Sequence, residues 1–389
     1  MKYLILFSII SLVCSCRQTS DGIQSQLIVA DLTQDYPPKR IELQDIADIT
    51  YIPLATADSM LVNSDFSVVS NDGIVVRGGK IGEILLFDKQ GQTLQGRICR
   101  RGQGPEEYTA IIHNIVDWER KEVFIGDYKS LKVYDFQGNY LRTLIRDNDM
   151  MMLDIGNLNR DYLLCGYNNS GSEEPYQPYF SLSKENGKTD TLTIEIPRFI
   201  ASNRKVEWDD GYVTDAYGYL PNLYKCADKI YLTNVALDTI FAIQPDQTRI
   251  PVMIPLQAPT QDEEAPLLYL RGINDHYAWT RKMPRHVKVQ LSNMMNDPSF
   301  LEKTYMYDRH TGEWFEPIYR NRAISNRKMD PKFINTTSVP YGYGLIILNA
   351  MDLVEAYENN QITDEKLKNI ASKLQEEDNP VLMLLKFKG

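Results

Sequence analysis

Short apolar stretches separated by turn residues run through most of the chain, and one unit of this pattern occurs twice within residues 82–145. The first copy ends its central strand at Asp88 and turns at Gly91, and the second does the same at Asp135 and Gly138. The two copies are therefore 47 residues apart at both positions. A repeat of about 40 to 50 residues built from short strands is typical of the blades of a β-propeller.

The second copy divides into four strands, each of which ends at a turn. In sequence order they are HNIVDW, KEVFIGD, LKVYDF and NYLRTLI. Four consecutive antiparallel strands of this length form one propeller blade. Upstream, Asn71-Asp72-Gly73 separates two further apolar runs and predicts a hairpin, because these residues adopt positive φ at little cost.

Less regular copies of the unit follow. A third copy turns at Gly187, a fourth follows a long insertion, and a fifth turns at Gly312. A sixth would combine YGYGLIILNA, the terminal NPVLMLLKFK and a strand from the N-terminal end of the domain, a pairing that removes the exposed sheet edge. The pattern thus predicts an all-β fold: a six-bladed β-propeller of four-stranded antiparallel blades, closed by pairing of the N- and C-terminal strands.

One short helix is predicted before the last strand. Thr363 is the expected N-cap, and Leu367, Ile370 and Leu374 fall on one helical face. Pro380 marks the end of this segment. The final apolar run, VLMLLKF, then returns as a buried strand.

The first fifteen residues have the features of a signal peptide. Lys2 precedes an apolar run from Leu4 to Val13, which is too short to span a hydrocarbon core about 30 Å thick. The run ends in Val-Cys-Ser-Cys, which resembles the lipobox of bacterial lipoproteins. This resemblance implies that Cys16 carries the lipid and anchors the protein to a membrane. The alternative is an ordinary secretory signal with a coincidental cysteine.

These features predict three segments. Residues 1–15 are the signal peptide, 16–40 a lipidated tether, and 41–389 the propeller. The expected location is the cell envelope, with the outer membrane favoured. The sequence leaves open whether the protein faces the periplasm or the cell surface.

Composition narrows the class of partner. The chain of 389 residues has 42 Lys and Arg against 52 Asp and Glu, a net charge of −10, and only 4 His. An acidic protein has no overall positive field for a polyanion, so nucleic acid is not expected as a partner. Cys99, Cys165 and Cys226 lie in apolar strand-like contexts, which favours buried free thiols, and one disulfide is the alternative.

Several longer sequence segments resemble those of a known family. LFDKQG followed by GRICRRGQGPEEY, then VYDFQGNYL, and EEDNPVLMLLKFK near the end are similar to the six-bladed β-propeller lipoproteins of gut anaerobes. The likeness covers nearly the whole mature chain, with Glu106 standing where the family more often has Gly. It implies a propeller of the NHL-like group located in the envelope. It implies no catalytic residues.

The glycine-rich segment between the first two repeats is the first candidate site. Arg101, Glu106, Glu107 and Tyr108 surround its glycine turn, so charged groups and exposed amides are able to meet a ligand at the mouth of the channel. The alternative, which we favour, is a connection between blades whose glycines permit the turn and whose charges pair with each other.

The insertion before the fourth repeat is the second candidate. Trp208, Asp209, Tyr212 and Tyr217 combine aromatic faces with a carboxylate, a combination that suits a sugar. Alternatively, the rings only cover the propeller. A third candidate is the basic stretch Arg271–Lys288, which suits a carboxylate or the tail of a partner, although a solvated helix or loop is the simpler interpretation.

Together these patterns predict a lipid-anchored envelope propeller that binds a glycan, a peptide or a protein partner at the loops of the channel mouth. The alternatives are a propeller hydrolase or lyase with its active site in the channel, and a structural subunit of an envelope complex. The sequence contains no HExxH, GxSxG or Cys-His motif, so no catalytic residue or metal ligand is assigned. No cofactor is expected, apart from a divalent cation in the channel under the enzyme hypothesis.

Overall fold

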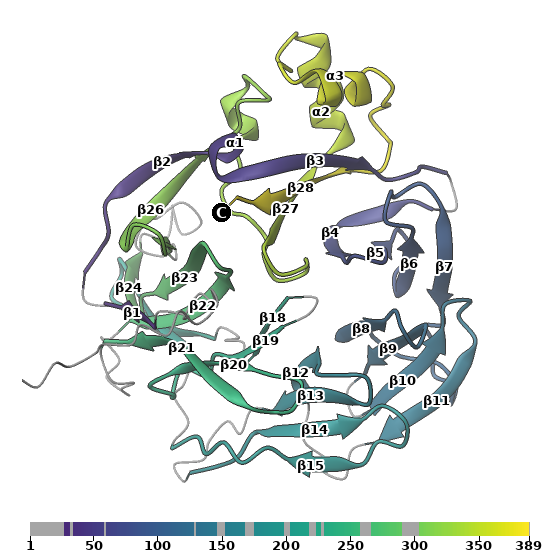
Figure 1. Ribbon diagram of the computed structural model, residues 1–389, viewed down its shortest axis with the longest axis vertical. Helices are drawn as coiled ribbons and strands as arrows, with labels where there is room; N and C mark the ends of the chain where they lie inside the picture. Colours follow the sequence, from purple (N-terminus) through teal and green to yellow (C-terminus); the bar gives the residue numbers. More distant parts are fainter. Residues whose placement is uncertain are drawn as a thin grey trace, which may run out of the picture.

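The computed structural model describes most of the chain after the N-terminal segment. The described ranges are 27–31, 34–57, 60–127, 130–145, 152–167, 175–197, 203–217, 223–226, 229–256, 266–289 and 303–388. The predicted signal peptide, 1–15, and the predicted lipidation site, Cys16, lie outside them. Most of the sheets are arranged in a ring around a common centre (Figure 1). Within the described ranges, no helix has the length and hydropathy needed to cross a membrane.

Three sheets of the ring are meanders of four antiparallel strands, in which the first strand lies nearest to the centre (Figure 1). The first sheet contains β4 (Val62–Val69), β5 (Ile74–Gly78), β6 (Glu83–Phe87) and β7 (Leu94–Cys99). The second contains β8 (His113–Asp117), β9 (Glu122–Gly126), β10 (Ser130–Asp135) and β11 (Tyr140–Ile145). The third contains β12 (Met152–Asn157), β13 (Tyr162–Tyr167), β14 (Tyr179–Ser183) and β15 (Thr189–Thr191). These strands confirm the predicted four-strand units.

The hydrophobic cores lie between neighbouring sheets. Every residue of β6 and of β9 is buried, because both faces of such a strand pack on another sheet. Phe124 of β9 and Leu182 of β14 belong to one buried cluster that joins the second sheet to the third. This two-sided burial explains why the sequence shows continuous apolar runs at these strands where one-sided burial would produce alternation.

The repeat in the sequence marks one type of turn. Gly91, Gly138, Gly187 and Gly312 all have φ between 73° and 80°, a region that glycine adopts without the steric cost of a Cβ. Each one follows the second-to-last strand of its sheet. Gln247 has φ 70° in the corresponding turn of the fourth repeat, which explains why the glycine spacing is lost there.

Two further sheets of the ring each gain a parallel strand from the N-terminal segment. One contains β18 (Leu223–Lys225), β19 (Ile230–Leu232), β20 (Ile240–Ile243), β21 (Arg249–Pro255) and β1 (Ile28–Ala30). The other contains β22 (Leu267–Ile273), β23 (Tyr277–Met283), β25 (Lys303–Asp308), β26 (Glu313–Arg320) and β2 (Pro38–Glu42). Part of the segment predicted as a tether, 16–40, therefore lies within the sheets.

The last sheet of the ring combines the two ends of the domain. It contains β27 (Tyr343–Leu348), β28 (Val381–Phe387) and β3 (Ala47–Pro53). β28 pairs antiparallel with β27 on one side and with β3 on the other. Residues more than 300 positions apart in the chain therefore share one set of backbone hydrogen bonds, as between Met383 and Tyr51.

The helices in the described part of the chain are short and lie beside this last sheet (Figure 1). They are α1 (Leu43–Ile46), the 3-10 turn η2 (Arg327–Met329), α2 (Ala350–Glu358) and α3 (Glu365–Ala371). α3 is the predicted helix, but its N-cap is Asp364, whose carboxylate accepts a hydrogen bond from Leu367 N at 2.9 Å. The prediction of Thr363 as the cap is therefore wrong. α2 has no counterpart in the sequence analysis.

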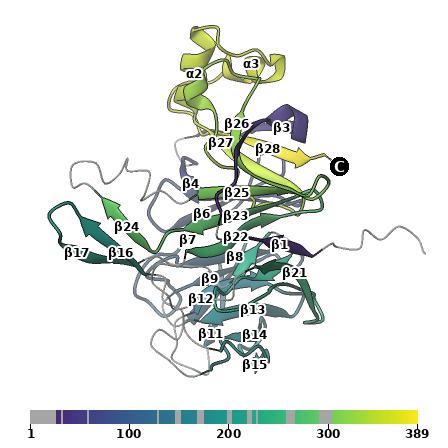
Figure 2. The same cartoon turned by 90° about the vertical axis from the view of Figure 1, so that its left-hand side faces the viewer.

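A separate sheet extends from one face of the ring (Figure 2). It contains β16 (Asn203–Trp208), β17 (Val213–Tyr217) and β24 (His286–Val289), and β24 pairs in parallel with β16. The basic stretch Arg271–Lys288 thus consists largely of strand residues of β22, β23 and β24. Its interpretation as a solvated helix or loop is wrong, because most of its residues pair in sheets, and Ala278, Trp279, Thr280 and Met283 of β23 are buried.

The three cysteines outside the N-terminal segment differ in burial. Cys165 and Cys226 are buried, whereas Cys99 is exposed at the end of β7. None of the three forms a disulfide within the described part of the chain. The expectation of buried thiols therefore holds for two of them.

Candidate functional site

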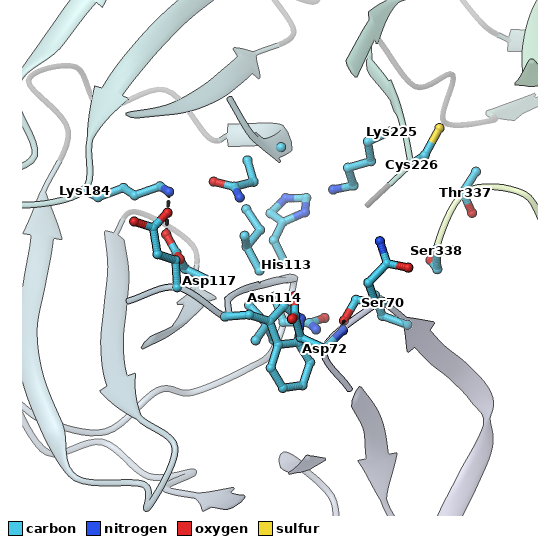
Figure 3. A pocket seen from close by; sticks show the side chains of 18 of the residues that line it. Ser70, Asp72, His113, Asn114, Asp117, Lys184, Lys225, Cys226, Thr337 and Ser338 are labelled. Atoms are coloured by element: carbon cyan, nitrogen blue, oxygen red, sulfur yellow. Dashed lines mark hydrogen bonds and ion pairs between the residues drawn. The ribbon is translucent and has the colours of Figure 1, made fainter. Parts of the chain in front are cut away.

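A cavity of about 500 Å³ lies where the inner strands of the ring converge (Figure 3). Its wall includes residues of the β4–β5 hairpin, of β8, of β12 and of β18, together with Thr337 and Ser338 before β27. The sheets of a propeller present their first strands to the central channel. The cavity is therefore a section of that channel, and its volume suits a small ligand.

Lys184 forms one corner of the cavity and is completely buried. Its Nζ donates to Asp117 Oδ2 at 2.6 Å and to the carbonyl oxygen of Asn159 at 2.6 Å. Asp117 lies at the end of β8 in the second sheet, whereas Lys184 follows β14 in the third. The pair therefore connects two neighbouring sheets. Desolvation lowers the pKa of Lys184, and the hydrogen bond to Asp117 opposes this effect.

The backbone around this ion pair is also held in place. Arg142 of β11 donates to both carboxylate oxygens of Glu122, at 2.8 and 2.7 Å, and to the carbonyl oxygen of Lys184 at 2.7 Å. The two-pronged geometry is the one that an arginine and a carboxylate prefer. Desolvation has the largest individual effect and raises the pKa of Glu122. The hydrogen bonds from Arg142 act in the opposite direction and contribute to a pKa below the ordinary value. This corner of the cavity is a rigid structural connection.

Lys225 forms a different corner. It is the last residue of β18, and its half-buried side chain reaches the cavity, where its Nζ donates to the carbonyl oxygen of Ile155 in β12. Within the described ranges no carboxylate makes an ion pair with this amine. Desolvation lowers the pKa of Lys225, and the charge of Asp154 opposes that effect.

Neutral polar groups occupy much of the remaining wall. Figure 3 shows His113 directed toward the middle of the cavity, with Lys225 approaching from the other side. Asn114, Asn157 and Ser338 also line the space. Side-chain amides and hydroxyls both donate and accept hydrogen bonds. The wall is therefore suited to a ligand that carries hydroxyl groups.

Trp118 gives the cavity an aromatic surface. Its ring packs edge-on against Phe136, with centroids 5.3 Å apart, and closely against Gly73 of the β4–β5 hairpin. A Cβ on Gly73 would lie 2.3 Å from the indole Cη2, so glycine is required for this approach. The position of the indole is therefore determined by two sheets.

Two of the three acidic residues of the lining interact with cations. Asp117 is bonded to Lys184, and Glu119 lies 3.4 Å from Arg160 in an exposed pair. Asp72 is exposed on the β4–β5 hairpin. Among the described residues, no three His, Cys, Asp or Glu side chains lie close enough together to hold a metal ion. The groups present in the cavity are therefore suited to hydrogen bonding and charge pairing.

A family model described as a domain of unknown function, DUF4934, matches residues 27–386. The chain belongs to the DUF4934 family. The matched range includes every residue of the cavity. No curated protein matches the chain significantly.

Two crystal structures share the architecture of this DUF4934 chain. An exported protein from Bacteroides fragilis NCTC 9343 is 14% identical, with a TM-score of 0.58, and the match covers 93% of this chain and 100% of that one. A member of the DUF4221 family from Bacteroides vulgatus ATCC 8482 is 11% identical, with a TM-score of 0.50, covering 88% and 97%. At these identities the likeness extends to the fold alone. The ring of antiparallel sheets is itself the arrangement of a β-propeller.

The first predicted site of the DUF4934 chain connects β7 to β8 and lies outside the cavity lining. Tyr108 is fully buried, its hydroxyl donates to the carbonyl oxygen of Gly82, and burial raises its pKa to about 12. Glu107 accepts a hydrogen bond from Gly104 N at 2.9 Å, and Arg101 donates to the carbonyl oxygen of Thr109 at 3.1 Å. These groups bond within the segment and to adjoining strands, as a connection between blades requires.

The remaining member of that group takes part through its backbone. The carbonyl oxygen of Glu106 accepts a hydrogen bond from the hydroxyl of Tyr134 at 2.7 Å. The rings of Tyr134 and Tyr108 meet edge-on, with centroids 5.8 Å apart. Aromatic packing thus fixes the glycine-rich segment onto the second sheet.

The second predicted site lies on the sheet that extends from the ring (Figure 2), away from the cavity lining. Trp208 Nε1 donates to Thr214 Oγ1 at 3.0 Å, and Asp209 is exposed in the turn between β16 and β17. Tyr212 is 65% exposed in the same turn. Tyr217 ends β17, and its side chain is outside the described structure. The structure does not bring this group together with Arg101–Tyr108.

Sequence reasoning missed the residues that line the cavity. Lys184 and Lys225 each occupy the edge of an apolar strand, and a lysine at such a position resembles an ordinary surface residue. His113 belongs to no motif in the sequence, and it is half-buried at the start of an inner strand. A usable signal was present: first strands of propeller blades face the channel, so polar residues on them are candidates.

Proposed function

We propose that the protein is an exported, lipid-anchored, six-bladed β-propeller that binds a small polar ligand in its central cavity. The observation that carries the binding role is the cavity itself: about 500 Å³, lined by ammonium, imidazole, amide and hydroxyl groups from several sheets. A concave site with a few convergent polar groups is the usual form of a small-molecule site. This proposal moves the ligand from the loops of the channel mouth into the channel.

The core supports six blades in a closed ring. Buried clusters lie between successive sheets around the whole ring, and one of them joins the sheet of β23 to that of β28 through Trp279 and Phe387. Another joins the β28 sheet to the β6 sheet through Leu382 and Leu85. Antiparallel pairing of β28 with β3 supports closure by the two ends of the domain.

Two observations support export and a lipid anchor. The sequence before the propeller resembles a lipoprotein signal ending at Cys16, and a structurally similar protein is described as exported. Replacing Cys16 by Ala should move the mature protein from the membrane fraction to the soluble fraction, because the acyl chains supply the membrane affinity. Unchanged membrane retention of the variant would contradict lipid anchoring.

Charge pairing in the cavity favours binding over hydrolysis or elimination. A propeller hydrolase or lyase of the kind considered from the sequence needs a carboxylate that is available to take or give a proton. Asp117 accepts hydrogen bonds from Lys184 and from Arg120 N, and Glu119 pairs with Arg160. Asp117 is therefore better placed to hold the wall together than to act on a substrate, and the third acidic residue of the lining, Asp72, lies exposed on the β4–β5 hairpin.

A cavity-filling substitution tests the binding role. Asn157 is an exposed strand residue of the cavity wall, so Asn157→Trp should fill the space without disturbing a buried contact. Mono- and disaccharides and short peptides are screened by ligand-observed NMR against the wild type. We expect a ligand that binds the wild type and fails to bind Asn157→Trp.

Lys386→Trp is the matched control. Lys386 is an exposed residue of β28 outside the cavity lining, and this variant should retain the ligand. The proposal fails if no compound binds the wild type, or if Asn157→Trp binds as well as Lys386→Trp.

The exposed turn of the extending sheet is a second surface for glycans. Tyr212 lies at its tip, with Trp208 and Asp209 beside it, and aromatic faces stack on sugars. Trp208→Ala combined with Tyr212→Ala should weaken binding on a glycan array if this surface is used. Retention of every glycan signal by the double variant would limit binding to the cavity.

A further inference from the structure

Lys225 presents a partly used ammonium group to the cavity. The side chain has three N–H donors, and the carbonyl oxygen of Ile155 takes one of them. The side chain is half-buried, so the amine still reaches the open space at the cavity wall (Figure 3). A cation in such a position has donors left for a ligand.

Lys184, in the same cavity, is an example of a cation whose role is structural. Its amine is completely enclosed and forms an ion pair with the carboxylate of Asp117 at 2.6 Å. The cost of removing both charges from water is offset by their attraction and by the added bond to the carbonyl oxygen of Asn159. Lys225 is also taken partly out of water, but a neutral carbonyl oxygen is its hydrogen-bond partner. Its charge is therefore compensated less completely.

We infer that the ligand of the cavity is a small hydroxylated carboxylate, and that Lys225 binds its carboxylate group. The inference rests on the proposed ligand-binding role of the cavity. A carboxylate supplies the negative charge that Lys225 lacks at short range, and charge-assisted hydrogen bonds are stronger than neutral ones. Attraction to a partly desolvated amine is also screened less than attraction at an open surface.

The surrounding wall supplies hydrogen-bonding groups for the hydroxyl groups of the ligand. Asn114 and Asn157 provide amides, and Ser338 provides a hydroxyl, on strands and loops that flank the cavity. The indole of Trp118 adds an apolar face on another side. A sugar acid combines these features, because it has a carboxylate, several hydroxyls and a face of C–H groups.

Matched sugar pairs test the inference. D-glucuronate is compared with D-glucose, and D-galacturonate with D-galactose, by isothermal titration calorimetry on the full mature chain. At least one acid should bind the wild type about tenfold or more tightly than its neutral partner, as expected for one charge-assisted contact. For a ligand found in the screen, its carboxylate and amide forms make the equivalent pair.

Substitutions of Lys225 assign the preference to this residue. Lys225→Met removes the charge and should lower the affinity for the acid about tenfold or more, leaving the neutral sugar unchanged. Lys225→Arg keeps the charge and should retain a preference for the acid. Circular dichroism establishes that each variant is folded. If a variant does not fold, the test is made on the wild type by measuring affinity at increasing salt concentration. The affinity for the acid should fall as salt rises, and the affinity for the neutral sugar should not.

Three results would overturn the inference. They are equal affinity of acid and neutral partner in the wild type, an unchanged preference in Lys225→Met, and acid binding that does not respond to salt. If ligands bind the wild type with no preference for the acid and are lost in Asn157→Trp, the proposed binding role stands and only the inference fails. If neither the sugar pairs nor the screen yields a ligand, both fail.

Discussion

Two lysines line the same cavity, and the main difference between their surroundings is the partner of the amine. Lys184 donates to a carboxylate and a carbonyl oxygen and is completely enclosed between two sheets. Lys225 donates to a carbonyl oxygen and remains half-buried at the cavity wall. Desolvation lowers the pKa of both amines, so burial alone does not distinguish them. The distinguishing feature is the partner.

This comparison separates structural charge from binding charge. A buried cation whose partner is part of the fold loses that partner only when the fold opens, so it contributes to stability. A cation that is directed into a cavity and hydrogen-bonded only to a neutral carbonyl oxygen gains an ion-pair partner when an anionic ligand enters, so it contributes to affinity. Substitutions at the two lysines should therefore have opposite profiles: one lowers stability, and the other lowers affinity.

The largest effect on stability is expected at Lys184. Lys184→Met leaves the carboxylate of Asp117 buried without its cation and should lower the free energy of unfolding by about 3 to 5 kcal/mol. Urea denaturation measures the change. Lys188→Met, at an exposed position after the same strand, is the control and should stay within about 0.5 kcal/mol of the wild type.

A second substitution shows whether the cost comes from the unpaired charge. Lys184→Met combined with Asp117→Leu removes both charges, and it should recover much of the stability lost in Lys184→Met, because apolar side chains of similar size replace a buried ion pair well. A loss below about 1 kcal/mol in Lys184→Met itself would remove the distinction between the two lysines.

The glycine-rich connection should behave like the Lys184 corner. Tyr108 is buried, and its hydroxyl donates to the carbonyl oxygen of Gly82 and accepts from Arg100 N at 3.2 Å. Tyr108→Phe leaves these backbone groups without a partner and should cost about 1 to 3 kcal/mol. Thermal unfolding measures this loss. Ligand affinity measured on the same variant should not change, and a fall in affinity would return this segment to the list of binding sites.

An exposed ion cluster should have a smaller effect. Asp35 accepts hydrogen bonds from Lys303, from Tyr305 at 2.7 Å and from Lys282 at 3.0 Å, and these bonds hold its pKa far below the ordinary carboxyl value. The carboxylate is about half exposed, so solvent screens the interaction. Asp35→Asn should therefore cost only about 1 kcal/mol or less at neutral pH.

The pH dependence of that difference follows from the lowered pKa. The stabilising effect of Asp35 is fully present above the ordinary carboxyl pKa of 3.8, and it is lost progressively as the pH falls from there through the lowered pKa of the folded state. The wild type and Asp35→Asn should thus approach equal stability in acid. Urea denaturation at pH 7 and near pH 3 gives the comparison, and a difference that grows in acid would contradict the assignment.

Of the two lysines in the cavity, Lys225 should show the smaller change in stability. Lys225→Met removes one hydrogen bond but also removes a charge from a poorly solvated position, so the unfolding free energy should stay within about 1 kcal/mol of the wild type. The same chemical change at Lys184 should cost several times more. Equal losses at the two positions would mean that Lys225 has a structural task and would weaken its assignment to a ligand.

The local β-structure was predictable because it depends on short-range chemistry. The glycine at the turn of each regular repeat adopts positive φ. The spacing of Gly91 and Gly138 in the sequence therefore predicts the same turn between the same two strands of successive sheets. Apolar runs such as that of β28 specify a strand buried on both faces. The pairing partner of β28 also followed, since an all-β chain needs to cover its last edge.

Other features depended on contacts between distant segments. Strands β1 and β2 come from a polar, proline-containing segment, and their hydrogen-bond partners in β21 and β26 are more than 200 residues away. Propensity is too weak to predict a strand at such a sequence. The tertiary fold supplies the open sheet edges that order it.

By itself, the sequence determined which residues turn, which strands are buried and that the fold is built from repeated sheets, because those properties are set by neighbours a few positions away. Only the tertiary structure decided that Lys184 meets Asp117, 67 positions away, while Lys225 meets a neutral carbonyl group. Side-chain alternation along a strand assigns a face, but the residue on the opposing sheet is set by how the sheets are arranged around the ring. Whether a buried charge serves the fold or a ligand is decided there.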